Sequence, residues 1–122
     1  WVDIRLSALL PHCRVSGGTQ YITDTITRLL DDFQTAGGDL PLWNKAFAAI
    51  VEHRPDAGCG AFDHDNKSVI NALKGRLFPD DNQFELSLGM FTVRDEDACC
   101  HIYVLPFEEA GDFLYRMASE LL

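Results

Sequence analysis

The stretch with the clearest capacity for chemistry is DACCHIYVLP, residues 97–106, where two cysteines and a histidine stand side by side. The apolar residues that alternate after them predict a strand. On a strand, Cys99 and His101 point to one face, and Cys100 points to the other. A thiol and an imidazole two residues apart on one face can form an ion pair or bind a metal ion together.

Cys100 is predicted to be a core thiol, because a free cysteine behaves as a small buried apolar residue. Since Cys99 and Cys100 point in opposite directions, they cannot easily share one metal ion. A disulfide between neighbours would also not fit regular strand geometry. The residues with chemical potential on this strand are therefore Cys99 and His101.

A second cysteine–histidine pair lies in a glycine-rich loop. Cys59 stands between two glycines, which would expose its sulfur and nearby N–H groups, and His64 is a candidate base for it. Cys59 could equally form a disulfide with Cys13 or Cys99. A zinc site at the strand pair needs one or two further ligands, and we consider His12 with Cys13, or Cys59 with His64. Nothing in the sequence shows that these residues converge.

Common catalytic and cofactor signatures are absent from the sequence. It contains no phosphate-binding loop, dinucleotide fingerprint, zinc-protease helix motif or hydrolase nucleophile motif. The acidic loop at 63–68 lacks the glycine and glutamate that an EF-hand requires at its sixth and twelfth positions. Our leading interpretation therefore has no catalytic residue, no cofactor and no bound metal.

Length and charge limit the class of protein. The chain has 122 residues, 47% of them hydrophobic, which suffices for a single compact domain over residues 1–122. Its formal net charge of -9 repels nucleic acids and anionic membrane surfaces. No apolar run approaches the roughly 18 residues of a membrane span. We expect a soluble protein, with the cytoplasm favoured over export after removal of a signal.

The chain starts with Trp1 in place of Met, and we therefore expect a piece of a longer protein or a processed product. Residues 1–10 fit either a short strand or a helical turn that ends before Pro11, and we favour helix or irregular structure. The clearest helix runs over residues 19–35, with Gly37 just past its end. Two acids in its last turns oppose the helix dipole, so either another residue compensates them or they serve outside folding.

Further elements follow from periodicity and from turn residues. A second helix is predicted from Pro41 to about His53, and a third begins at Asp65 or Asn66, contains Gly75 in close packing, and stops at Pro79. The apolar residues then recur with a period of two, which predicts a strand from Phe84 to Val93 with a β-bulge at Gly89. The polar residues 94–97 predict a hairpin turn before the strand from Cys99 to Leu105, and the last helix follows Pro106.

These elements predict an α+β fold in which about four helices pack on a small antiparallel sheet. The sheet is built around a C-terminal β-hairpin, and a final helix follows that hairpin. Because a lone hairpin is marginal in water, we expect it to lie on the helices or to gain strands. Its free edge is a candidate site for strand addition, including formation of a homodimer.

The excess of acidic over basic residues suggests a protein partner. Our leading hypothesis is a non-catalytic acidic domain of the inhibitor, immunity, adaptor or chaperone type, which docks on a basic surface of another protein. The candidate contact residues are exposed acids near turns: Asp31, Asp32, Asp80, Asp81, Asp95, Glu96 and Asp97. The alternative is a small thiol- or metal-dependent enzyme or sensor that uses Cys99 with His101, or Cys59 with His64. We expect no nucleic-acid or membrane partner.

Overall fold

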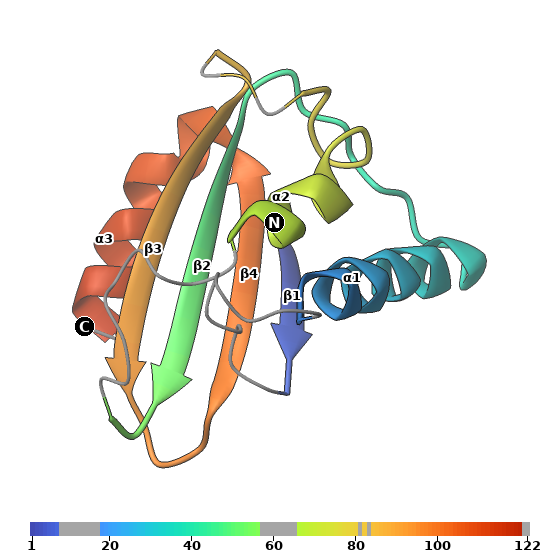
Figure 1. The fold of residues 1–122 in the computed structure, drawn as a ribbon. Coiled ribbons are helices and arrows are strands. Elements are labelled where there is room, and N and C mark those ends of the chain that lie inside the picture. Colours follow the sequence, from blue (N-terminus) through green and yellow to red (C-terminus); the bar gives the residue numbers. More distant parts are fainter. Residues whose placement is uncertain (8–17, 57–65, 81, 83, 121–122) are drawn as a thin grey trace.

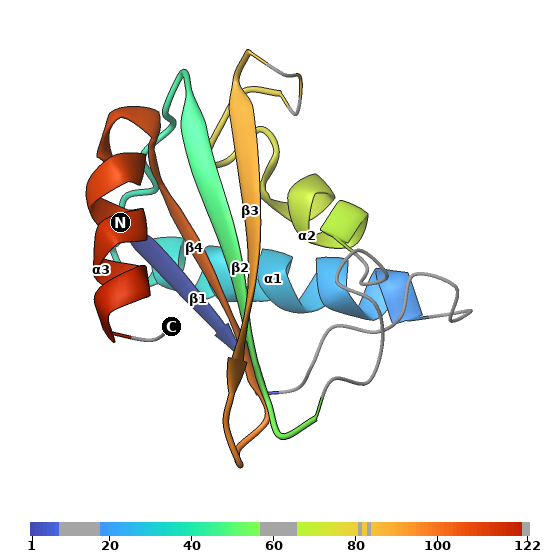
Figure 2. The same cartoon turned by 90° about the vertical axis from the view of Figure 1, so that its left-hand side faces the viewer.

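The computed structural model of the chain describes residues 1–7, 18–56, 66–80, 82 and 84–120. These residues form an α+β domain of three layers, with a four-stranded sheet in the middle (Figures 1 and 2). Helices α1 (Gly18–Thr35) and α2 (Asn66–Leu73) cover one face, and α3 (Ala110–Glu120) covers the other. A short 3-10 helix, Phe107–Glu109, leads into α3.

The strands are β1 (Val2–Leu6), β2 (Ala46–Arg54), β3 (Leu86–Arg94) and β4 (Cys99–Pro106). Their order in the sheet is β1-β4-β2-β3. β4 is antiparallel to both β1 and β2, whereas β2 and β3 are parallel. The sheet is therefore mixed, with β1 and β3 at its edges.

This architecture corrects the predicted fold class. The α+β class and the final helix hold, but the described residues contain three α-helices in place of about four, and the sheet is not antiparallel throughout. The predicted C-terminal hairpin is also wrong. β3 and β4 follow each other along the chain, but β2 lies between them and pairs with both.

The second predicted helix is wrong, because Ala46–Arg54 forms the strand β2. Its first seven residues are all buried. A strand that is covered on both faces needs apolar residues at every position, so its sequence loses the alternation that identifies a strand. The apolar positions then matched a helical spacing by chance.

Three smaller expectations are also corrected. Residues 2–6 form a strand, where we favoured helix or irregular structure. Gly89 lies in a ladder whose register runs without interruption along β3, so there is no bulge. Gly75 follows the end of α2 with a φ of +80°, and no atom lies close to where its Cβ would stand. It is therefore a turn residue and not a packing position inside a helix.

The two faces of the sheet carry separate cores. α1 and α2 pack on the face formed by Ile4, Ile50 and Ile102, and α3 packs on the face formed by Phe47 and Leu105. Gly37, with a φ of +95°, ends α1 as predicted. No helix in the described part of the chain combines the length and apolar character needed to cross a membrane.

Candidate functional site

The strand register brings three potential metal ligands together on one face of the sheet. In the β2–β4 ladder, His53 is the direct partner of Cys99, and His101 follows two residues along β4. Direct cross-strand partners and residues two apart on one strand share a face, so all three side chains point to the side that α3 covers. One ligand atom from each residue lies within 4.8 Å of the other two.

The cluster is sheltered but not closed. Cys99 is buried, and the side chains of His53 and His101 are 13% and 20% exposed. The ring of Tyr103 stacks on His101, with centroids 5.6 Å apart and an angle of 10° between the ring planes. Tyr103 in turn contacts Phe113 of α3, so aromatic rings separate the cluster from the apolar core.

Each of the two histidines has a carboxylate partner. His53 Nδ1 lies 3.2 Å from Asp95 Oδ2, and His101 Nδ1 lies 3.0 Å from Asp3 Oδ1. With the proton on Nδ1 directed to the carboxylate, Nε2 keeps the lone pair that a metal ion needs. Carboxylates in this position fix the orientation and the tautomer of metal-binding histidines.

Asp95 is itself held in place by backbone contacts. Its other carboxylate oxygen accepts a hydrogen bond from the Asp97 N–H at 3.1 Å, and its own N–H donates to the carbonyl of Arg54 at 3.0 Å. The Asp97 N–H and His53 together lower the pKa of Asp95 below its ordinary value. Asp95 is therefore a fixed negative charge beside His53.

The structure separates the two neighbouring cysteines as predicted. Cys99 belongs to the cluster, whereas Cys100 is fully buried on the opposite face among apolar residues. Burial, with a smaller contribution from the Glu52 carboxylate, raises the pKa of Cys100 to about 12. Both are free thiols. Cys100 is a core residue and is not available for thiolate chemistry.

The sequence predicts the pairing of Cys99 with His101 but does not include His53, the third member of the cluster. The predicted helix from Pro41 to about His53 puts His53 at the end of a helix, where no strand register connects it to Cys99. The ligands that we considered instead, His12, Cys13, Cys59 and His64, lie outside the described residues. The signal that could have revealed His53 is the buried run of residues 46–51 directly before it, once that run is taken as a strand.

The predicted acidic contact residues do not gather on one surface. Asp31 and Asp32 lie at the end of α1, Asp80 precedes β3, and residues 95–97 follow β3 at its other end (Figure 1). A nine-residue strand spans roughly 25–30 Å, so Asp80 and Asp95 stand far apart. Asp81 lies outside the described residues. Docking through these acids stays a prediction.

Asp31 and Asp95 have side-chain partners within the fold. Arg76 forms an ion pair with Asp31 at 2.8 Å, and Asp95 is engaged with His53. Arg76 also donates a hydrogen bond to Gln34 in the last turn of α1. It therefore supplies the compensation that the acidic end of this helix requires.

Comparisons with known proteins add no function. No protein-family model matches the chain, and no curated protein matches its sequence. Function has to be argued from the site alone.

Proposed function

We propose that this protein binds one Zn²⁺ ion through His53, Cys99 and His101. The observation that carries the proposal is the carboxylate on the Nδ1 side of each histidine. Two such partners around one thiol match the arrangement that orients histidine ligands in zinc proteins. The proposal takes up the metal-dependent alternative that the sequence left open, and it departs from the expectation of a metal-free domain.

The donor set fits zinc. Imidazole nitrogen and thiolate sulfur are its usual ligands, with Zn–N distances of about 2.0–2.1 Å and Zn–S distances of about 2.3 Å. Tetrahedral geometry then requires ligand atoms about 3.4–3.6 Å apart. One potential ligand atom from each residue lies within 4.8 Å of the other two, so zinc binding requires the three side chains to move closer together. The carboxylates of Asp3 and Asp95 add negative charge that favours a cation.

Three protein ligands leave one coordination position for water, a substrate or a further ligand. This is the pattern of catalytic zinc sites, where the ion activates a bound water or polarises a carbonyl group. The partial exposure of His53 and His101 is consistent with access to that position. We therefore favour a metal-dependent enzyme or sensor over a purely structural zinc site.

The direct test is titration of the metal-free protein with Co²⁺, followed by displacement with Zn²⁺. We expect one ion per chain, a Zn²⁺ dissociation constant below about 1 μM, and an absorption spectrum typical of a tetrahedral site with a thiolate ligand. His53→Ala and Cys99→Ser should each abolish tight binding. Cys100→Ala is the matched control, because it removes the neighbouring thiol, which points away from the site, and it should retain binding.

Three results would overturn the proposal. One is the absence of tight binding, and another is equal binding by wild type and Cys99→Ser. Loss of binding in the Cys100→Ala control, with the fold intact by circular dichroism, would show that the thiolate ligand is Cys100, on the opposite face of the sheet. An intense visible band with Cu²⁺ together with weak Zn²⁺ binding would reassign the ion, since two histidines and a cysteine also form blue-copper sites.

A further inference from the structure

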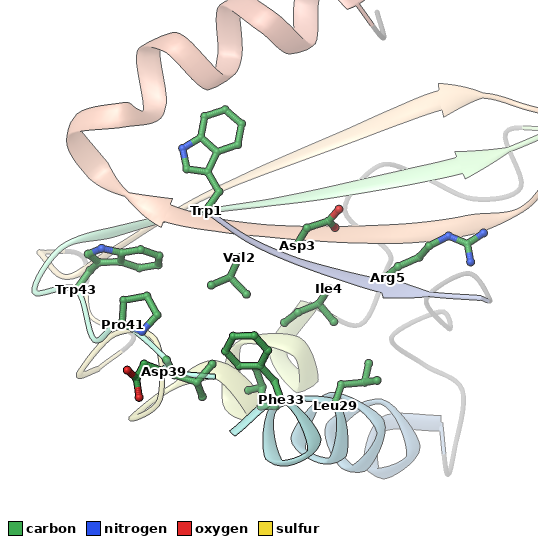
Figure 3. Close-up of a pocket in the computed structure, with 12 residues that line it drawn as sticks. Trp1, Val2, Asp3, Ile4, Arg5, Leu29, Phe33, Asp39, Pro41 and Trp43 are labelled. Atoms are coloured by element: carbon green, nitrogen blue, oxygen red, sulfur yellow. The ribbon is translucent and has the colours of Figure 1, made fainter. Parts of the chain in front are cut away.

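A groove of about 440 Å³ runs along the outer edge of β1 and faces α1 (Figure 3). Its β1 wall consists of five consecutive residues, from Trp1 to Arg5. Consecutive strand residues alternate between the two faces of a sheet, so a groove lined by all five lies against the edge of the strand. The volume lies within the range of ligand-binding pockets in proteins.

In the part of the chain that the structure describes, no strand pairs with the edge of β1 that faces the groove. β1 is the first strand in the order β1-β4-β2-β3, and it pairs with β4 alone. Among the described residues, no backbone–backbone hydrogen bond involves residues 1–7 outside that ladder. Every second residue of β1 therefore directs an N–H and a C=O toward the groove, where another strand can bind them.

The opposite wall of the groove is apolar. It is formed by Leu29, Leu30 and Phe33 of α1 and by Leu40, Pro41 and Trp43 of the segment that follows α1. Phe33 is 50% exposed and Leu29 is 37% exposed, which is unusual for large apolar side chains on adjoining turns of one helix. The missing side chain of Gly38 lets the Phe33 ring lie directly against the backbone.

The groove differs in charge between its two ends. Asp39 lies with Pro41 and Trp43 at one end, and Arg5 lies at the other (Figure 3). A carboxylate and an indole ring at the same end of a groove suit a basic peptide residue, because the first can form an ion pair and the second a cation–π contact. The net charge of -9 also favours the approach of a basic partner.

We propose that the β1–α1 groove binds an extended peptide segment of another protein, which adds to β1 as a fifth strand. Backbone hydrogen bonds to β1 supply affinity, and alternate apolar side chains of the peptide pack on Leu29 and Phe33. A basic residue of the peptide lies beside Asp39. A small apolar molecule could fill the same volume, but it would leave the N–H and C=O groups of β1 to water. This proposal does not depend on the zinc site.

The test starts from a phage-displayed library of random heptapeptides selected on the full chain. Phe33→Asp serves for counter-selection, because it places a charge on the apolar wall at a half-exposed position where folding should survive. We expect enriched peptides to alternate apolar and polar residues, to lack proline at the centre and to carry lysine or arginine. Tyr115→Asp is the matched control, since Tyr115 is 76% exposed on α3 across the sheet.

An enriched peptide can be measured by intrinsic fluorescence, because Trp43, one of the two tryptophans of the chain, lines the groove, whereas the ring of Trp1 packs on Phe113 of α3. We expect saturable binding that Phe33→Asp and Asp39→Asn weaken by about tenfold or more, the usual effect of removing a central contact. Successive residues of a strand direct their N–H groups to opposite edges. N-methylation of every second peptide residue should therefore abolish binding when the methylated N–H groups face β1. It should leave binding intact when they face away from β1. Tyr115→Asp should bind like wild type.

Four outcomes would overturn the proposal. They are a selection with no enrichment over Phe33→Asp, enriched peptides without strand alternation, binding that N-methylation leaves unchanged, and binding that Tyr115→Asp weakens as much as Phe33→Asp does. Sedimentation that shows a dimer of wild type at tens of micromolar, lost in Phe33→Asp, would assign the groove to a second copy of the chain instead.

Discussion

Asp95, in the turn that follows β3, holds the ring of His53 at the end of β2, with 3.2 Å between Oδ2 and Nδ1. The β3–β4 connection thus passes the end of the strand that lies between β3 and β4. One carboxylate from this connection thereby orients a side chain that the β2–β4 ladder has already placed beside Cys99.

Replacing Asp95 by Asn should weaken Zn²⁺ binding by about 10–100-fold, the usual effect of removing the partner of a histidine ligand. Asp97→Asn is the control, because it removes one negative charge from the same turn. It keeps the backbone N–H of residue 97, which donates a hydrogen bond to the Asp95 carboxylate. Competition with a chelator of known affinity measures both variants. Equal losses in the two variants would show that only the general negative charge matters.

The phenol of Tyr103 should titrate above the ordinary value of a tyrosine. Burial, with a smaller contribution from the Asp3 carboxylate, raises the pKa of Tyr103 above its ordinary value of 10.0. Tyr21 and Tyr115 are 64% and 76% exposed. The difference between the spectrophotometric titrations of wild type and Tyr103→Phe isolates the transition of this phenol, and Asp3→Asn should move that transition to lower pH. Titration of Tyr103 at the ordinary value of a tyrosine would contradict the effect of its burial.

The same shift makes stability depend on pH in one direction. A phenol whose pKa is higher in the folded chain than in the unfolded chain stabilises the fold fully below the unfolded value of 10.0. That contribution is lost as the pH rises through the folded value. The unfolding free energy of wild type minus that of Tyr103→Phe should therefore stay constant below about pH 9 and decrease at higher pH.

Gly89→Ala should destabilise the fold by about 1–3 kcal/mol, the usual cost of inserting a group into a packed core. A Cβ at Gly89 would stand 2.9 Å from the Phe91 ring and 3.1 Å from the Phe47 ring. Gly111→Ala is the contrasting variant, because no atom lies within 4 Å of its Cβ position on α3. It should stabilise the chain by up to about 1 kcal/mol through helix propensity. Chemical denaturation measures both changes.

The helices that carry their own end signals could be predicted from the sequence. Gly37 marks the end of α1, and α3 follows Pro106 with its acidic first turns. The orientation of Cys99 and Cys100 could also be predicted, because the alternation of side chains on a strand is a local property. These predictions required no knowledge of what the segments pair with.

The pairing of strands could not be predicted, because it depends on contacts between distant parts of the chain. A short polar turn between two strands is typical of a hairpin, yet β2 lies between β3 and β4. The buried run before His53 has no period of two, since helices cover both faces of β2. Because β2 could not be predicted as a strand, His53 could not be predicted as the third residue of the candidate zinc site.

The position of β2 between β3 and β4 also bears on how the chain folds. The short connection at 95–98 keeps β3 and β4 close together in the unfolded chain, so a direct hairpin between them costs little loop entropy. The native sheet requires the more distant β2 to pair with both strands. A chain that closes the hairpin early must open it again before β2 can enter. We therefore expect local β3–β4 pairing to delay folding, because the native pairing requires long-range contacts, which form slowly.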